Sequence, residues 1–281
     1  MTPHLSLRIR HHTGFTYDGL AKSSYNEARM SPSVGSNQSV RQTQIVVTPI
    51  TALASYRDYF DTIVTSFDIQ QSHSLLSIES RSMVESDAAL LAPCLSWEEL
   101  QHRDLVDRYS DYLSTTKRTR LPESVLNLVE TFREKLDVHE CAEAVGELVR
   151  SRVNYLPGAT SVSSTASDAW QQESGVCQDI THVTIGLMRF LGVPVRYVSG
   201  YLYPSEEYDI DVAVDGQSHA WIEYFAGQWT GIDPTNGLRE TERHIIVGRG
   251  RDYDDVPPLK GIYQGPTSSN LGVVVQMSRV R

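Results

Sequence analysis

The sequence contains little cysteine and no long apolar run, and these absences exclude several classes of protein. Three cysteines in 281 residues are too few, and odd in number, for a disulfide framework, which favours a reducing compartment such as the cytoplasm. No run is long and apolar enough to span a membrane, and Met1-Thr2-Pro3-His4 lacks the apolar core of a signal peptide. We therefore expect a cytoplasmic protein that does not use a membrane as partner.

Positive charge is also in deficit. Lys and Arg number 25 against 35 Asp and Glu, which gives a formal net charge of −10. This balance disfavours nucleic acid and anionic membranes as partners. Hydrophobic residues make up 40% of the chain and charged residues 21%, as in globular rather than disordered proteins. A chain of this length suits two domains with a substantial core, and no pattern in it defines an oligomeric state.

The first 90 residues alternate apolar and polar side chains in the manner of β-strands. Strands are expected at 5–11, 44–47, 54–60, 63–69 and 75–84. We therefore predict a small all-β sandwich domain over residues 1–90. No motif in these residues indicates what that domain does.

From residue 97 the periodicity becomes helical and later returns to strands. Helices are expected at 97–103, 104–113, 122–135 and 138–153, with a short one ending near Glu173. Strands are expected at 195–203, 219–225, 228–233, 244–248 and 272–277. Residues 91–281 are thus predicted to form an α+β domain, in which a helical segment leads into a helix packed on an antiparallel sheet.

The clearest chemical signal is Cys177 at the start of a predicted helix. The break signal Ser174-Gly175 precedes it, and the apolar run that follows ends at Leu191, just before Gly192. The unpaired N–H groups and the positive dipole end of a helix favour a thiolate in the first turn. Because the thiolate is the nucleophilic form of cysteine, Cys177 is a candidate nucleophile.

The base expected to take the proton of this thiol is His219. His182 is nearer in sequence, but it points about 140° around the helix from Cys177. A predicted hairpin with the loop Phe225-Ala226-Gly227 connects His219 to Asp233. Their spacing is even, so the two residues are expected to pair directly and share a face. Asp233 would then orient the imidazole, and the three groups would transfer an acyl group through a thioester.

Three motifs in this region resemble the signature blocks of the bacterial transglutaminase-like cysteine enzymes, a branch of the papain-like superfamily. They are GVCQD at 175–179, SHAW at 218–221 and GIDPTNG at 231–237. Segments 8–17, 195–201 and 247–258 extend the resemblance to the N-terminal β domain, the strand after the helix and a C-terminal block of that family. The resemblance implies a papain-like transglutaminase core with Cys177 as nucleophile, His219 as base and Asp233 as the orienting residue.

Neighbouring residues are assigned supporting roles. The backbone N–H groups of Cys177 and Gln178 are placed to stabilise an oxyanion. By the resemblance, an indole or amide upstream assists them, and Trp170 and Gln171 are the local candidates. Asp179 lies in the first helical turn, where a carboxylate interacts favourably with the helix dipole, so we favour a structural role for it over catalysis.

Two tryptophans, Trp221 and Trp229, share the predicted face of the hairpin that carries His219. They either wall a substrate tunnel or belong to the core, and the sequence leaves both interpretations open. Cysteine, histidine and aspartate are also metal ligands by type. However, no C-x-x-C or H-x-x-x-H pair accompanies them, so neither a metal nor another cofactor is expected.

The sequence therefore predicts a cysteine enzyme that acts on an amide in a peptide or protein substrate. Water would resolve the thioester in a protease or amidase, and an amine would resolve it in a transglutaminase. We favour hydrolysis of a peptide or glutamine-type amide, because the sequence contains no D-x-D-x-D-G calcium loop of the kind that would indicate a calcium-dependent transglutaminase. The alternatives are a protein-glutamine amine transferase and a non-catalytic scaffold that binds peptides.

Overall fold

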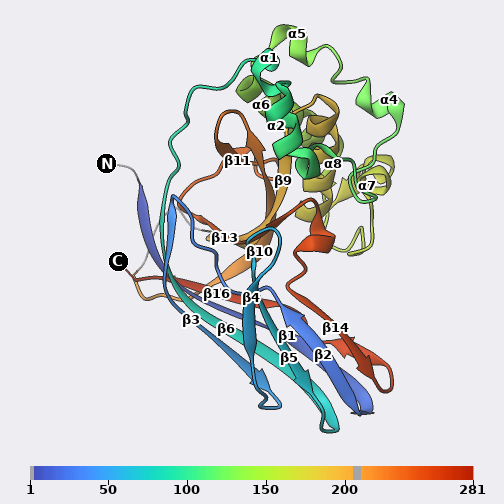
Figure 1. Cartoon of the computed structure of the whole chain (residues 1–281). Helices are drawn as coiled ribbons and strands as arrows, with labels where there is room; N and C mark the ends of the chain where they lie inside the picture. Colours follow the sequence, from blue (N-terminus) through green and yellow to red (C-terminus); the bar gives the residue numbers. More distant parts are fainter. Residues whose placement is uncertain (1–2, 205–209, 281) are drawn as a thin grey trace.

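The computed structural model describes residues 3–204 and 210–280. It has the predicted α+β architecture, with a β domain at one end of the molecule and helices covering an antiparallel sheet at the other (Figure 1). Within the described residues, no helix has both the length and the apolar character needed to cross a membrane.

The N-terminal residues form two packed sheets, which confirms the predicted sandwich. One sheet contains β1 (His4–Ala21), β6 (His73–Asp87) and β3 (Gln38–Thr48). The other contains β14 (Leu259–Gln264), β2 (Ser23–Ala28), β5 (Ile63–Ile69) and β4 (Ala54–Arg57). Alternate apolar residues of both sheets are buried together, among them Phe67, Ile69, Leu76 and Ile78, as the period of two along a strand requires.

The helical segment lies where the sequence predicts it but is more fragmented. Its elements are α1 (Trp97–Leu100), α2 (Arg103–Arg108), α3 (Ser110–Leu113), α4 (Glu123–Leu126), α5 (Phe132–Lys135), α6 (Val138–Arg152) and α7 (Ala166–Gln172). The single helix expected over 122–135 is wrong. Turns separate α4 from α5, and Leu128, which completes the apolar spacing in the sequence, is half exposed. Asn127 and Thr131, both weak helix formers, lie in this break.

The long helix α8 (Cys177–Phe190) packs on a sheet made of five strands. These are β9 (Val195–Leu202), β10 (Val214–Phe225), β11 (Trp229–Asp233), β12 (Leu238–Arg239) and β13 (His244–Gly250). Ala220, Ile222 and Tyr224 of β10 join the helical core. Trp221 instead belongs to a separate cluster with Val198, so the opposite face of β10 carries Trp221 and, by the strand period, His219.

The sheets of the two domains are continuous. The strand β16 (Val274–Arg279) pairs with β10 on one side and with β1 on the other. The smaller elements are β7 (Asn154–Tyr155), β8 (Ser174–Gly175), the 3₁₀ turn η1 (Tyr253–Asp255) and β15 (Ser268–Asn270). We keep the proposed boundary near residue 90. The structure adds that β14, β15 and β16 return to the sheets of the N-terminal domain.

Gly200→Ala is expected to destabilise the fold by about 2–3 kcal/mol, because overpacking in a filled site strains the backbone. Gly200 pairs with His219 in the sheet. An added Cβ would lie 2.1 Å from the Ile245 carbonyl oxygen and 2.6 Å from the Trp221 ring. Urea unfolding of the purified protein measures the loss. Gly35→Ala is the matched control, since its Cβ would meet nothing within 4 Å; equal midpoints for the two variants would contradict the packing argument.

Candidate active site

Cys177 is the first residue of α8 and is partly exposed. The residues that follow it in the helix are buried from Gln178 to Arg189. Asp179 caps the helix start, because its Oδ2 accepts hydrogen bonds from the Val176 N–H at 2.9 Å and from the Thr160 hydroxyl at 2.5 Å. The thiol therefore lies at the positive end of a helix whose first turn is fixed by a buried carboxylate.

His219 and Asp233 meet across the β10–β11 hairpin. The Nε2 of His219 donates to Asp233 Oδ2 at 2.7 Å. The predicted shared face is correct, but the predicted direct pairing is wrong. Phe225 pairs with Trp229, so the loop is 226–228 rather than 225–227, and Asp233 lies diagonally from His219. Diagonal neighbours on one face of a sheet remain within reach of long side chains.

The thiol of Cys177 interacts with this imidazole. Burial alone would lower the pKa of His219, but Asp233 and Cys177 outweigh burial through hydrogen bonding and charge and raise it to about 10. Because Nε2 faces Asp233, Nδ1 is the ring nitrogen left for the thiol. The imidazole therefore retains its proton through the neutral pH range, between a sulfur and a carboxylate. We refer to Cys177, His219 and Asp233 together as the Cys–His–Asp cluster.

Five hydrogen bonds fix the carboxylate of Asp233. Its Oδ1 accepts from the backbone N–H groups of Thr235 at 3.0 Å and Asn236 at 3.1 Å. Its Oδ2 accepts from His219, from Asn236 Nδ2 at 2.7 Å and from His244 Nε2 at 3.3 Å. Burial opposes ionisation, but these donors, His219 first, hold the pKa of Asp233 far below its usual range. Asp233 is thus a fixed negative charge.

His219, Asp233 and His244 bring three potential metal-ligating atoms within 4.8 Å of one another. The hydrogen bonds of His244 test whether this set suits a metal. Its Nδ1 accepts from the Thr241 N–H at 3.1 Å, so the proton of the neutral ring is on Nε2, the nitrogen that faces Asp233. A metal ligand needs a bare nitrogen at that position. The hydrogen bonds therefore favour a proton-linked network over metal coordination.

Comparison with known proteins identifies the family. Residues 7–85 match the profile of the bacterial transglutaminase-like N-terminal region, and residues 127–234 match that of the transglutaminase-like superfamily. An uncharacterized protein of Mycobacterium leprae is 39% identical over 277 residues, which cover 98% of this chain and 99% of the relative. The chain belongs to the transglutaminase-like superfamily. The predicted resemblance is confirmed, and membership supports a cysteine-dependent enzyme.

One further sequence match and one structural match extend the comparison of this transglutaminase-like chain. A protein-glutamine gamma-glutamyltransferase of Pseudomonas aeruginosa is 28% identical over 115 residues, or 36% of this chain and 17% of that protein. A crystal structure described as a "putative cysteine protease" from Cytophaga hutchinsonii superposes with a TM-score of 0.78 at 18% identity. The superposition covers 100% of this chain and 92% of that one. It shows that the whole fold, including the N-terminal β domain, is shared.

The residues next to Cys177 in this transglutaminase-like core lie in different surroundings. The side chain of Gln178 donates to the Val162 carbonyl at 3.3 Å and so attaches the 159–165 loop to the helix start. Asp179 is fully buried, and burial raises its pKa. Trp170 packs against the helical core with Arg152 over its ring, and Gln171 is exposed. The role of Trp170 and Gln171 in stabilising an oxyanion stays a prediction.

The two tryptophans of the hairpin differ in their surroundings. Trp221 is fully buried and stacks on His219, with the ring centroids 6.0 Å apart. Its indole Nε1 donates to Glu240 Oε2 at 2.7 Å. Trp229 is partly exposed and lies under the guanidinium of Arg196 at 4.0 Å. Trp221 thus supports the imidazole from within the core, while Trp229 lines a cavity.

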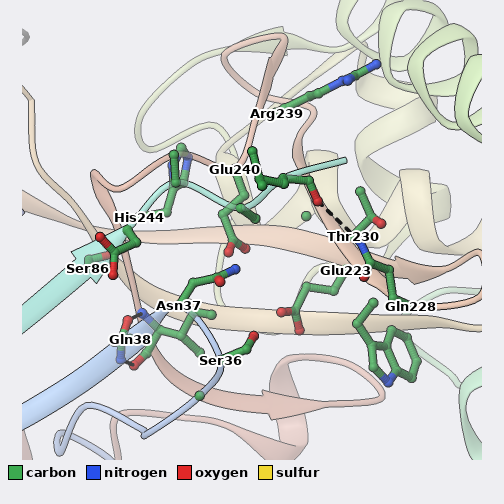
Figure 2. A pocket seen from close by; sticks show the side chains of 18 of the residues that line it. Ser36, Asn37, Gln38, Ser86, Glu223, Gln228, Thr230, Arg239, Glu240 and His244 are labelled. Carbon is green, nitrogen blue, oxygen red and sulfur yellow. Dashed lines mark hydrogen bonds between the residues drawn. The ribbon is translucent and has the colours of Figure 1, made fainter. Parts of the chain in front are cut away.

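That cavity has a volume of about 750 Å³ and lies between the two domains. Figure 2 shows Glu223, Glu240 and His244 from the transglutaminase-like core, with Asn37 and Gln38 approaching from the N-terminal domain. The sequence did not predict that Glu240 and His244 line this cavity, nor that they bond to Trp221 and Asp233. The sequence offered one signal for them, namely that both follow the GIDPTNG motif closely, in the segment that leads into β13.

Proposed function

We propose that the Cys–His–Asp cluster catalyses acyl transfer on an amide, with hydrolysis of a peptide or glutamine-type amide as the reaction. The observation that supports this most directly is that His219 interacts with Cys177 and with the ionised Asp233 at once. This is the arrangement that nucleophilic catalysis requires of a base and its orienting group. Membership of the transglutaminase-like superfamily is consistent with it.

In the proposed reaction, the Cys177 sulfur attacks the amide carbonyl carbon, and a C–S bond forms as the carbonyl π electrons move to oxygen. Backbone N–H groups at the start of α8, including that of Gln178, stabilise this oxyanion. His219 then gives its proton to the amide nitrogen, the C–N bond breaks and the amine leaves. Water attacks the thioester, returns a proton to His219 and expels the thiolate, which restores the starting state.

A second reaction shares every step but the last. An amine in place of water would yield a new amide, and the name of the Pseudomonas aeruginosa relative favours this alternative. Glutamine-containing peptides incubated with and without a primary amine such as putrescine, and read by mass spectrometry, distinguish the two. Conversion to glutamate or backbone cleavage supports hydrolysis, and incorporation of the amine supports transfer. The proposal fails if Cys177→Ala produces the same products as the wild type, or if no peptide changes in a broad glutamine-peptide library.

Alkylation tests the cluster without knowledge of its substrate. Iodoacetamide at about pH 6.5 is expected to modify Cys177 at least roughly tenfold faster than free cysteine, since a helix N-terminus and a neighbouring imidazole both activate a cysteine as a nucleophile. His219→Ala should abolish that advantage. Peptide mapping locates the label, and Cys141 is an internal control because burial raises its pKa to about 12. Labelling no faster than free cysteine would indicate a non-catalytic peptide-binding scaffold instead.

We propose the cytoplasm as the location of this activity. The three cysteines are all free thiols in the structure, and two of them lie away from the cluster. Structural thiols that are neither paired nor catalytic are compatible with a reducing compartment. Cell fractionation with a compartment-specific alkylating reagent measures this directly.

A further inference from the structure

His244 contacts Asp233 of the Cys–His–Asp cluster but has no role in the reaction proposed above. It begins β13, and only 2% of its surface is exposed. Its ring lies 5.2 Å from that of Trp221, nearly edge-on, and 6.3 Å from that of His219. Two aromatic rings and a carboxylate therefore define its orientation.

The backbone partner of His244 indicates which tautomer its neutral ring adopts. The Thr241 N–H donates to Nδ1 at 3.1 Å, which requires a bare nitrogen there. The proton of the neutral ring is then on Nε2, and it is directed at Asp233 Oδ2 at 3.3 Å. The four-residue turn 241–244 thus selects the tautomer that can donate to the carboxylate.

This tautomer places a second imidazole N–H donor at Asp233 Oδ2. Asp233 Oδ2 accepts from both His244 and His219, while two backbone N–H groups hold Oδ1. With both oxygens occupied, the carboxylate cannot rotate about its last bond without losing several hydrogen bonds in a buried site. A carboxylate that cannot rotate fixes the plane of the His219 ring, and hence the direction in which Nδ1 faces Cys177.

We propose that His244 is a positioning residue for the cluster, which acts on His219 through Asp233 by donating its Nε2–H to the shared oxygen. This inference rests on the proposed function. It assigns to the 241–244 turn the task of keeping the imidazole aligned with the sulfur. Glu240, which lines the same cavity as His244, accepts a hydrogen bond from the Trp221 indole at Oε2.

The test compares two replacements by the rate of Cys177 alkylation at about pH 7. His244→Phe keeps the ring but removes the donor, and a roughly tenfold slower reaction is expected from the loss of a hydrogen bond to a charged group. His244→Gln restores an N–H near the position of Nε2 and should recover most of the rate. His139→Phe is the matched control, because His139 is a buried histidine that bonds to Tyr224 and the Ala92 carbonyl.

A double-mutant cycle with Asp233→Ala separates positioning from general packing. If His244 acts through Asp233, His244→Phe will change the alkylation rate little once Asp233 is absent. An equal loss in both backgrounds, or the same loss from His139→Phe, overturns the proposal. Should His244→Phe not fold, ¹⁵N NMR of the wild-type histidines decides the matter, since a proton on Nδ1 of His244 contradicts the proposal and a proton on Nε2 supports it.

The alkylation rate of wild-type Cys177 shows which of the two proposals fails. If wild-type Cys177 reacts no faster than free cysteine, the proposed function fails. If wild-type Cys177 is fast and His244→Phe is equally fast, only the positioning role is overturned.

Discussion

Asp233→Asn is expected to lower the rate of acyl transfer by about ten thousandfold while leaving the protein folded. The asparagine can still accept the backbone N–H groups of Thr235 and Asn236 at one oxygen. Its NH₂ group, however, would replace Oδ2 and face the donors of His219 and His244. The imidazole would then have to turn or change tautomer, and it would lose the charge that stabilises its protonated form.

The measurement is the turnover of whichever glutamine-containing peptide the wild type converts, together with the thermal unfolding midpoint. Asp58→Asn is the matched control. Asp58 also accepts two backbone N–H groups through Oδ1, those of Phe60 and Thr62, but in a turn of the N-terminal domain. If Asp233→Asn retained a tenth or more of the wild-type rate, the carboxylate would not have the role proposed for it.

Glu223→Ala is expected to destabilise the protein by about 3–5 kcal/mol, the largest effect on stability that we predict. Glu223 is buried and accepts hydrogen bonds from both Arg196 and Arg249. Burial favours the neutral acid, yet the two guanidinium groups hold the pKa of Glu223 below its usual value. Removal of the shared carboxylate leaves two mostly buried cations without their partner, which costs far more than the pair contributes when intact.

Chemical denaturation followed by circular dichroism measures this loss. Glu85→Ala is the control, because Glu85 pairs with Arg41 on the exposed surface of the N-terminal domain. Its removal should leave the unfolding midpoint near that of the wild type, since exposed ion pairs contribute little. Similar midpoints for the two variants would show that water reaches Arg196 and Arg249 freely. Rescue of Glu223→Ala by Arg249→Met would support the ion-cluster explanation.

The sequence was most informative where the structure depends on local patterns. The start of α8 at Cys177 and its end before Gly192, whose φ is +82°, follow from a break signal, an apolar periodicity and a glycine. The strand expected at 63–69 coincides with β5. Such elements are decided by neighbours in sequence, so a single chain contains the information needed to predict them.

In the β10–β11 hairpin, residue spacing predicts the face of each side chain but not the register of the two strands. Even spacing correctly predicts that His219 and Asp233 share a face, because the period of a strand is two. The register is determined by the turn, and Gly227, with a φ of +104°, occupies the middle of the loop rather than its end. When a three-residue loop moves by one residue along the chain, the pairing of the two strands shifts by two residues. The direct partners then change, but each side chain stays on the same face.

The rest of the site depends on contacts between segments that no local pattern relates. His244 reaches Asp233 only because the chain folds back through β12 before it enters β13. Arg249 lies in a stretch of charged residues, which is typical of a solvated loop, yet its guanidinium and that of Arg196 both donate to the buried Glu223. Polar residues of this kind acquire partners through tertiary packing, which composition and spacing do not predict.

The position of β16 has a consequence for how the chain is made. This strand lies between β10 and β1, and it pairs residues near the two ends of the described chain, such as Leu7 with Arg279 (Figure 1). In the described chain β1 precedes β16 by nearly the whole sequence, so the edge of β1 that pairs with β16 stays open until β16 has been made. Open strand edges invite pairing with other chains. The edge of β1 is therefore a point at which a chain that has not yet added β16 can pair with another chain.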